Sequence, residues 1–256
     1  MNDLNRTFFE YGLLPVVTLT DASRAVGLGE ALVSGGLPVA EITLRSDAGI
    51  DGIREIAKNC PDLLVGAGTV LSVDQAMAAS DAGARFVVTP GYSRHVVEWC
   101  LKNEMPVYPG ISGTEGIEMA RAHGLSVVKF FPAEQSGGIP MLKALSAPYQ
   151  SIRFIPTGGI GPGNVNDYLA LPYVVACGGS WLAAKSAVAS GDFESVTATV
   201  RASVGQVCGC VAGPDGITIK VTNLDRTRAY LQRSGATVRI DGGAVTVTSD
   251  GVTFTA

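Results

Sequence analysis

The alternation of short apolar runs with helical segments constrains the fold of this chain more than any other feature of its sequence. The apolar runs are too short for helices and are bounded by proline, glycine or capping residues, which is typical of buried strands. The predicted strands are 13–19, 39–44, 63–67, 86–89, 106–111, 127–131, 153–156 and 174–177. Apolar residues at helical spacing predict the helices 25–33, 48–58, 73–82, 94–103, 114–123, 139–145, 164–169 and 192–204.

This order of eight strand-then-helix units predicts an α/β protein with a parallel sheet and crossover helices. Eight such units can close on themselves, so we expect a (β/α)8 TIM barrel preceded by an N-terminal helix at 2–12. An open doubly wound sheet is the weaker alternative, because no Gly-x-Gly-x-x-Gly follows an early strand. In a barrel, the residues that carry chemistry lie at the C-terminal ends of the strands.

The pattern changes after about residue 206. Residues 216–221 alternate like a strand, 225–234 look helical, and 237–255 alternate again around glycine-containing turns. This order predicts a small α+β (βαβββ) extension, weakly similar to half of a glyoxalase-type module. The predicted domains are a barrel at 1–206 and an extension at 207–256. Because the extension contains no histidine and no glutamate, contact with a neighbouring subunit or a lid over the site is favoured over a second catalytic site.

The composition excludes several classes of partner. The formal net charge is -4 and no basic run occurs, so nucleic acid is not an expected partner. No apolar run reaches the roughly 18 residues that a membrane helix needs, and the start lacks a secretory core. We therefore expect a cytoplasmic protein without a membrane partner. The five cysteines are odd in number and scattered, which fits a reducing compartment.

Metal ligands are poorly represented in the sequence. The two histidines, His95 and His123, each lie in a predicted helix and far from any cluster of acidic residues or cysteines. We expect no metal and no other cofactor, although residue counts leave a magnesium site built from carboxylates open. Without zinc to polarise a carbonyl group, a lysine imine is the available electron sink.

Lys129 lies inside the apolar strand 127–131, which proline ends at position 132. Burying an ammonium group is costly unless the group is paired or loses its proton, and a neutral amine is a nucleophile. An isolated lysine in such a strand is more commonly the exposed residue of an edge strand. Its place at the end of the sixth of eight predicted strands favours the nucleophile here.

Glu41, Thr43 and Arg45 share one face of the second predicted strand, because strand side chains alternate with a period of two. A carboxylate there can move protons, and a guanidinium can bind a substrate carboxylate. A surface ion pair or a structural bridge inside the barrel is the alternative.

Two glycine pairs follow the seventh and eighth predicted strands: Gly158-Gly159, and Gly178-Gly179 before Ser180. Barrels of this kind commonly bind phosphate at these two places, on backbone amides and a short helix N-terminus. One glycine pair alone is more often a simple turn. Two pairs at these two strands predict a phosphate site more specifically.

Six short motifs occur in a fixed order between residues 10 and 205. They are Glu41-Ile42-Thr43-Leu44-Arg45, Gly66-Ala67-Gly68-Thr69-Val70, Pro109-Gly110-Ile111-Ser112, Lys129-Phe130-Phe131-Pro132-Ala133-Glu134, Pro156-Thr157-Gly158-Gly159-Ile160 and Gly178-Gly179-Ser180-Trp181-Leu182. At this spacing they closely resemble the bacterial 2-keto-3-deoxy-6-phosphogluconate (KDPG) aldolases, which also act on 4-hydroxy-2-oxoglutarate (KHG). The resemblance implies a class I aldolase and a homotrimer. It also implies that Lys129 forms an imine with the keto carbon while Glu41 transfers protons.

The resemblance also implies how the substrate is bound. Arg45 and Thr69 would hold the pyruvate carboxylate, while Pro90 and Phe131 would shape the pocket. The residues implied for the phosphate end of the sugar acid are Thr157, Gly158, Gly159, Gly179 and Ser180.

The implied reaction is the reversible cleavage of KDPG to pyruvate and glyceraldehyde 3-phosphate, the aldol step of the Entner-Doudoroff pathway. Cleavage of KHG to pyruvate and glyoxylate is implied as well. A 2-keto-3-deoxy-6-phosphogalactonate aldolase, a non-catalytic barrel that binds phosphosugar acids, and another phosphate-binding barrel enzyme are the alternatives. At Thr18 many relatives carry a basic residue, so the choice between phosphorylated and plain substrates stays open.

Overall fold

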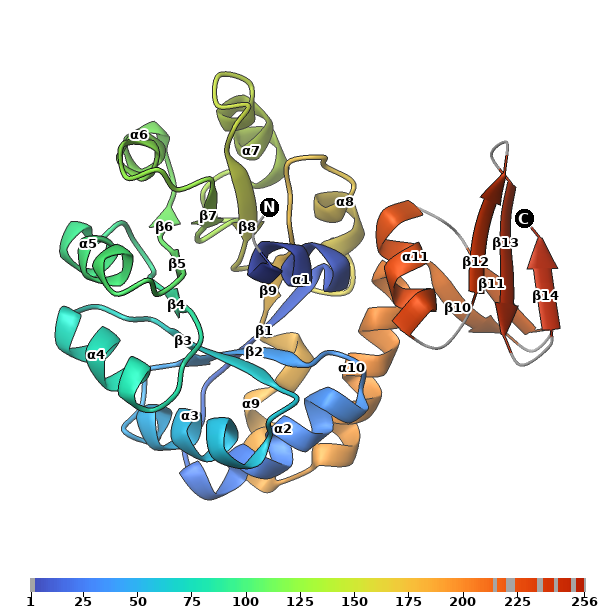
Figure 1. Cartoon of the computed structure of the whole chain (residues 1–256), viewed down its shortest axis with the longest axis horizontal. Helices are drawn as coiled ribbons and strands as arrows, with labels where there is room; N and C mark the ends of the chain where they lie inside the picture. The colour runs from blue at the N-terminus through green and yellow to red at the C-terminus, as the bar shows by residue number, and fades with distance from the viewer. Residues whose placement is uncertain are drawn as a thin grey trace.

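The computed structural model describes residues 3–213, 216–219, 224–233, 237–241, 244–249 and 252–255. Parallel strands lie at the centre of the larger part of the chain, and helices surround them (Figure 1). The strands of this part are β1 (Leu13–Val17), β2 (Val39–Thr43), β3 (Leu64–Gly68), β4 (Val87–Val88), β5 (Val107–Tyr108), β6 (Gly110–Ile111), β7 (Val127–Phe130), β8 (Arg153–Pro156) and β9 (Cys177–Gly179).

The helices alternate with the strands, as the apolar periodicity predicts. They are α1 (Asp3–Tyr11), α2 (Ala25–Ser34), α3 (Ala48–Asn59), α4 (Val73–Asp81), α5 (Arg94–Lys102), α6 (Thr114–Ala122), α7 (Gly138–Ser146), α8 (Val165–Leu169), α9 (Lys185–Ser190) and α10 (Phe193–Val207), with the 3-10 helices η1 (Ala22–Arg24) and η2 (Trp181–Ala183). Helix α9 and both 3-10 helices were not predicted. Among the described helices, none has the length and apolarity to cross a membrane.

The predicted α/β class with parallel strands is confirmed, but the strands divide into two parallel sheets instead of one. Six strands pair in the order β5-β4-β3-β2-β1-β9, and three pair in the order β6-β7-β8. The fifth predicted strand is split into β5 and β6 at Pro109, because proline has no amide hydrogen to donate to a neighbouring strand. Its carbonyl oxygen still accepts a hydrogen bond from the amide of Lys129 at 2.9 Å.

The eighth strand begins later than predicted. β9 contains Gly178 and Gly179, which pair with β1, whereas the sequence predicted this glycine pair as the loop after a strand at 174–177. The two sheets meet here at isolated parallel bridges, which are Phe154 with Val174 and Thr157 with Gly178. At Gly178, a Cβ atom would lie 2.2 Å from Oγ1 of Thr157, so the two backbones approach this closely only with glycine.

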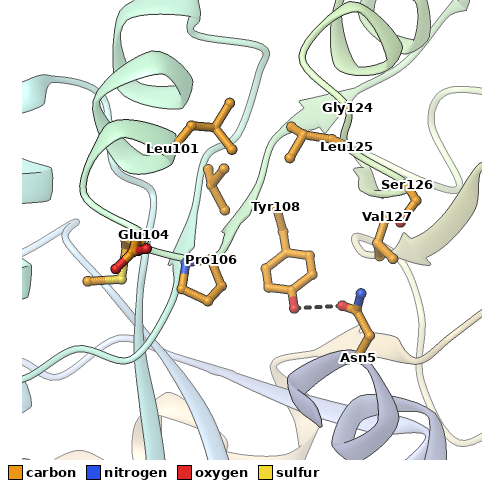
Figure 2. Close-up of a pocket in the computed structure, with 11 residues that line it drawn as sticks. Asn5, Leu101, Glu104, Pro106, Tyr108, Gly124, Leu125, Ser126 and Val127 are labelled. Atoms are coloured by element: carbon orange, nitrogen blue, oxygen red, sulfur yellow. Dashed lines mark hydrogen bonds between the residues drawn. The ribbon is translucent and has the colours of Figure 1, made fainter. Parts of the chain in front are cut away.

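Helix α1 covers the N-terminal ends of the strands. The ring of Phe8 packs 5.3 Å from that of Phe86 and 5.2 Å from that of Tyr108, measured between centroids. The hydroxyl of Tyr108 donates a hydrogen bond of 2.7 Å to Oδ1 of Asn5 (Figure 2). Aromatic packing of α1 thus covers part of this end of the strands.

The extension after α10 carries one strand more than predicted. Its elements are β10 (Cys210–Gly213), β11 (Gly216–Ile219), α11 (Leu224–Arg233), β12 (Thr237–Asp241), β13 (Ala244–Ser249) and β14 (Val252–Thr255), which gives the order ββαβββ. β10 and β11 form an antiparallel hairpin, and β12, β13 and β14 form an antiparallel sheet. The predicted helix start at residue 2, the predicted ends at 220–221 and 234, and the turn positions 242–243 and 250–251 lie outside the described residues.

Helix α11 packs against α1 through the buried side chain of Arg226, which is 1% exposed. The Nε atom of Arg226 donates to the carbonyl oxygen of Phe9 at 3.0 Å, and Nη2 donates to that of Val175 at 3.4 Å. The guanidinium also lies 5.2 Å from the centroid of the Phe9 ring. Next to it, the hydroxyl of Thr227 donates to the carbonyl oxygen of Cys208 at 2.8 Å. The extension is thus tied to the first helix and to the segment before β9.

Candidate active site

Lys129 and Glu41 form a buried contact between strands that lie far apart in the sequence. The Nζ atom of Lys129 lies 3.0 Å from Oε1 and 3.4 Å from Oε2 of Glu41. Lys129 is 4% exposed and Glu41 is 1% exposed. Lys129 is therefore not the exposed residue of an edge strand, and Glu41 is not part of a surface ion pair. At this distance the carboxylate can take a proton from the ammonium and leave a nucleophilic amine.

Glu41 and Lys129 each lie opposite a glycine on the neighbouring strand. Glu41 of β2 pairs with Gly66 of β3, and Lys129 of β7 pairs with Gly110 of β6. Two residues further along β3, Gly68 leaves the space that the Glu41 side chain occupies. A Cβ atom on Gly68 would lie 2.2 Å from Oε1 and 2.4 Å from Cγ of Glu41. The position of the carboxylate thus depends on glycine at the end of β3.

Replacement of Gly68 by alanine should displace the Glu41 carboxylate from Lys129. We expect the predicted aldolase activity to fall about 10²-fold in kcat, since a displacement near 1 Å at a reacting group has effects of that size. Steady-state kinetics measures the effect, with Gly113→Ala as the control because no atom lies within 4 Å of a Cβ placed there. An unchanged kcat in a folded Gly68→Ala variant would show that the position of Glu41 does not matter.

Phe131 directly follows the strand of Lys129, and Pro90 lies beside the neighbouring strand β6. The centroid of the half-buried Phe131 ring is 5.3 Å from Nζ of Lys129, which allows a cation–π interaction. The carbonyl oxygen of Pro90 packs on β6, since a Cβ atom on Gly110 would lie 2.1 Å from it. The hydroxyl of Thr89 donates to the carbonyl oxygen of Gly91 at 2.6 Å and so closes the turn that contains Pro90.

Arg45 and Thr69 form a second contact, at the C-terminal ends of β2 and β3. The Nε atom of the exposed Arg45 donates to Oγ1 of Thr69 at 3.2 Å. Thr69 has a φ of +56°, in the left-handed region that a β-branched residue rarely adopts. Such a conformation costs about 1–3 kcal/mol and concentrates at ligand sites. The pair presents a cationic group and a hydroxyl at the same strand ends as Glu41.

The residues predicted to bind phosphate gather at the ends of β8 and β9. Thr157 is 6% exposed and faces Gly178 across the bridge between the two sheets. Gly158 and Gly159 follow it with φ values of +99° and +77°, which only glycine adopts without strain. Gly179 packs against the ring of Trp181, and the exposed Ser180 lies between them in sequence. The structure therefore brings both glycine pairs to neighbouring strand ends.

Two polar contacts were not predicted, one at the C-terminal ends of β1 and β2 and one between α8 and the loop after β7. The hydroxyls of Thr18 and Thr43 lie 2.8 Å apart, and Thr43 also donates to the carbonyl oxygen of Val17 at 3.1 Å. The second contact joins the hydroxyl of Tyr168 to Oε1 of Glu134. Glu134 is the last residue of the motif that begins at Lys129, so the sequence indicates that it lies near the candidate site. Tyr168 lies on α8 and is recognised as a partner only from the structure.

Metal ligands do not gather in the part of the chain that the structure describes. No group of three or more histidine, cysteine, aspartate or glutamate side chains there is arranged to hold an ion.

A cavity of about 300 Å³ lies at the other end of the strands from Lys129 (Figure 2). Its walls come from α1, from the segments that precede β5 and β7, and from the first residues of those strands. The residues that line it include Asn5, Leu101, Glu104, Met105, Tyr108 and Leu125. Because none of the predicted site residues lines it, this cavity is separate from the candidate active site.

Known proteins are similar to the part of this chain that precedes the extension. The family model described as KDPG and KHG aldolase matches residues 5–199. A 2-dehydro-3-deoxy-phosphogluconate aldolase of Treponema pallidum is 49% identical over 186 residues, which are 73% of this chain and 89% of that protein. The crystal structure of a KDPG aldolase from Legionella pneumophila, with pyruvate captured as a covalent carbinolamine intermediate, superposes with a TM-score of 0.75 at 36% identity and covers 77% of this chain and 96% of its own.

A second solved structure has a ligand that carries a phosphate group. It is the KDPG aldolase of Zymomonas mobilis with 3-phosphoglycerate, which is similar to this chain with a TM-score of 0.74 and 34% identity, over 80% of this chain and 96% of its own. The family model covers more than half of the chain, and the relative from Treponema is matched over 89% of its own length. The chain belongs to the KDPG and KHG aldolase family.

Proposed function

We propose that this protein is a class I aldolase that reversibly cleaves KDPG to pyruvate and glyceraldehyde 3-phosphate, and KHG to pyruvate and glyoxylate. The observation that carries the proposal is the buried contact of 3.0 Å between Lys129 Nζ and Glu41 Oε1. The covalent pyruvate intermediate in the Legionella relative supports an amine nucleophile in the family. The family model includes both substrates in its description.

In the first half of the reaction, Glu41 accepts a proton from Lys129, and the neutral amine attacks the C2 keto carbon of the substrate. The carbinolamine that results loses water to give a protonated imine. This cation draws electrons from the bond between C3 and C4. A buried site with little water favours the step, because charge interactions are stronger there than in bulk water.

In the second half, Glu41 removes the proton of the C4 hydroxyl, directly or through a water molecule, while the C3–C4 bond breaks. The aldehyde leaves, and the electron pair of the broken bond forms an enamine with the imine carbon. Protonation at C3 restores the imine, and addition of water releases pyruvate and the Lys129 amine. Each proton that Glu41 accepts is returned in a later step, so the enzyme ends in its starting state.

The remaining predicted residues hold the two ends of the substrate. We assign the pyruvate carboxylate to Arg45 and Thr69, whose mutual hydrogen bond of 3.2 Å orients the guanidinium. Pro90 and Phe131 form walls near the reacting carbon. The phosphate is assigned to the strand ends that carry Thr157, Gly158, Gly159, Gly179 and Ser180. The phosphorylated ligand of the Zymomonas relative supports a phosphate site in the family.

None of the three alternatives gains support from a specific contact among the described residues. A barrel that only binds phosphosugar acids does not need a buried lysine beside a carboxylate. The galactonate epimer differs from KDPG at C4, next to Glu41. Steady-state comparison of the two epimers measures that preference directly.

We also propose that the two parallel sheets form a closed (β/α)8 barrel. The bridges between β8 and β9, and the hydrogen bond between Lys129 and Pro109, support closure on both sides.

A boundary between barrel and extension near residue 206 is supported by the end of the family match at residue 199. A homotrimer and a cytoplasmic location stay predictions of the resemblance and the composition, and sedimentation equilibrium measures the number of subunits.

Reduction with borohydride in the presence of pyruvate tests the proposed function. The reductant converts the imine to a stable amine, so peptide mass spectrometry should find one reduced pyruvate group on Lys129. The variant Lys129→Ala should give no adduct, whereas the exposed Lys143→Ala should be labelled like the native protein. An adduct that persists in Lys129→Ala, or no adduct in the native protein, contradicts an imine at this residue.

A further inference from the structure

The hydroxyl of Tyr168 and the carboxylate of Glu134 form a contact that the proposed reaction does not use. Tyr168 lies on α8 with 1% of its surface exposed, and its hydroxyl donates a hydrogen bond to Oε1 of Glu134. Glu134 is an exposed residue of the loop between β7 and α7. The contact therefore joins the loop after Lys129 to the helix that follows Gly158 and Gly159.

The Cβ and Cγ atoms of Glu134 pack against Gly159, the second glycine of the turn Gly158-Gly159. A Cβ atom on Gly159 would lie 2.5 Å from Cγ and 2.6 Å from Cβ of Glu134. The backbones are paired as well, because the amide of Glu134 donates to the carbonyl oxygen of Gly158 at 3.1 Å. The side chain that carries the Glu134 carboxylate thus leaves the backbone next to the turn to which the phosphate is assigned.

The surroundings of the contact fix the direction of that carboxylate. A Cβ atom on Gly138 would lie 3.2 Å from both Glu134 Oε1 and the Tyr168 hydroxyl, so the backbone of α7 packs beside the hydrogen bond. Burial raises the pKa of Tyr168, and its hydrogen bond to Glu134 and the charge of that carboxylate raise it further. The phenol therefore keeps its proton at neutral pH and stays a donor to Glu134.

The other side of the turn is held independently. Oδ1 of Asn164 accepts a hydrogen bond from the amide of Gly161 at 2.9 Å, and its Nδ2 donates to the carbonyl oxygen of Gly159 at 3.2 Å. The shape of the turn therefore does not depend on Tyr168 alone. The side-chain partner of Tyr168 is the carboxylate of Glu134.

We propose that Tyr168 is a specificity-determining positioning residue, which holds the Glu134 carboxylate away from the Gly158-Gly159 turn so that a phosphorylated substrate can bind there. The proposal rests on the assignment of the phosphate to this turn under the proposed function. A carboxylate with free side-chain torsions next to the turn repels a phosphate and competes with it for backbone donors. The hydroxyl of Tyr168 removes this competition by engaging one carboxylate oxygen.

The variant Tyr168→Phe tests the proposal, because it keeps the ring and removes the hydroxyl. We expect KM for KDPG to rise about 10-fold, the loss associated with one hydrogen bond to a charged group. The change in KM for KHG, which has no phosphate, should stay below about 2-fold, within ordinary variation between mutants. Tyr173→Phe, on the segment after α8, is the matched control and should change neither KM.

A double-mutant cycle separates the charge of Glu134 from a general loosening of the turn. In the Glu134→Gln background the neutral amide has no charge to misplace, so Tyr168→Phe should no longer raise KM for KDPG. If Tyr168 only supports the turn sterically, its substitution has the same effect in both backgrounds. That outcome, or an equal rise of KM for both substrates, overturns the proposal.

Binding of 3-phosphoglycerate, with glycerate as the unphosphorylated control, gives a readout that does not require turnover. Calorimetry should show weaker binding of 3-phosphoglycerate in Tyr168→Phe, with recovery in the double variant. A native protein that binds 3-phosphoglycerate but cleaves neither keto acid contradicts the proposed function; the inference is then supported if calorimetry shows weaker binding in Tyr168→Phe and recovery in the double variant, and is overturned if it does not. A native protein that cleaves KDPG with no effect of Tyr168→Phe contradicts this inference alone.

Discussion

Lys129→Arg abolishes aldol cleavage while the protein stays folded. Arginine keeps a positive charge beside Glu41, but its guanidinium stays protonated and cannot form an imine with a keto acid. We expect kcat to fall at least about 10⁴-fold, as it does when a covalent nucleophile is removed from an enzyme. Cleavage of KDPG, coupled to the detection of pyruvate, measures the loss.

The control for this variant is Lys143→Arg on α7, an exposed lysine that should tolerate the exchange. Because arginine is larger than lysine and position 129 is 4% exposed, a thermal melt establishes that Lys129→Arg is folded. If it is not, Lys129→Met supplies the same test without the added bulk. Turnover by either folded variant within about 10-fold of the native kcat would rule out an imine mechanism.

Arg226→Met lowers the stability of the whole protein. Methionine fits a buried position but leaves the carbonyl oxygens of Phe9 and Val175 without the donors that Arg226 supplies. Unmade hydrogen bonds to a charged buried group cost about 2–4 kcal/mol in total. For a chain of this size, that corresponds to a decrease in Tm of about 5–10 °C. Differential scanning calorimetry measures it.

The matched control is Arg228→Met on the same helix, at a half-buried position, which should change Tm by less than about 2 °C. The comparison matters because Arg226 joins the extension to α1 and to the segment before β9. Gly12→Ala should act in the same direction, since a Cβ atom there would lie 2.6 Å from Nε of Arg226. Equal melting temperatures for Arg226→Met and Arg228→Met would show that the extension is held by other contacts.

The positions of the helices and strands could be predicted from the sequence because they depend on local patterns. Helix α3 spans Ala48–Asn59 where apolar spacing predicts 48–58, and β8 spans Arg153–Pro156 as predicted. Pro38, Gly35 and Pro106 lie directly beside the start of β2, the end of α2 and the start of β5. The prediction was wrong at β9, because the extended conformation of Gly178 and Gly179 comes from pairing with β1 and not from their own preference.

Local sequence patterns also predicted part of the candidate site. Lys129 is conspicuous as a charge in an apolar strand, and Glu41 and Arg45 follow the alternation of β2. The roles of these residues stay predictions, but their positions at the strand ends agree with them. Glu134 lies in the motif around Lys129, but the sequence does not indicate its role, because its partner Tyr168 is 34 residues away and on a different element.

The sequence by itself determined the order of strands and helices, the chemical types at the strand ends and the family to which the chain is similar. The tertiary structure alone decided which of these side chains touch: Lys129 with Glu41, 88 residues apart, and Arg226 with the end of α1, 217 residues apart. Such contacts depend on sheet register and on the packing of distant segments, which local periodicity does not encode. The sequence alone already favours Lys129 as a nucleophile, but only the fold shows that the Glu41 carboxylate lies 3.0 Å from its Nζ atom.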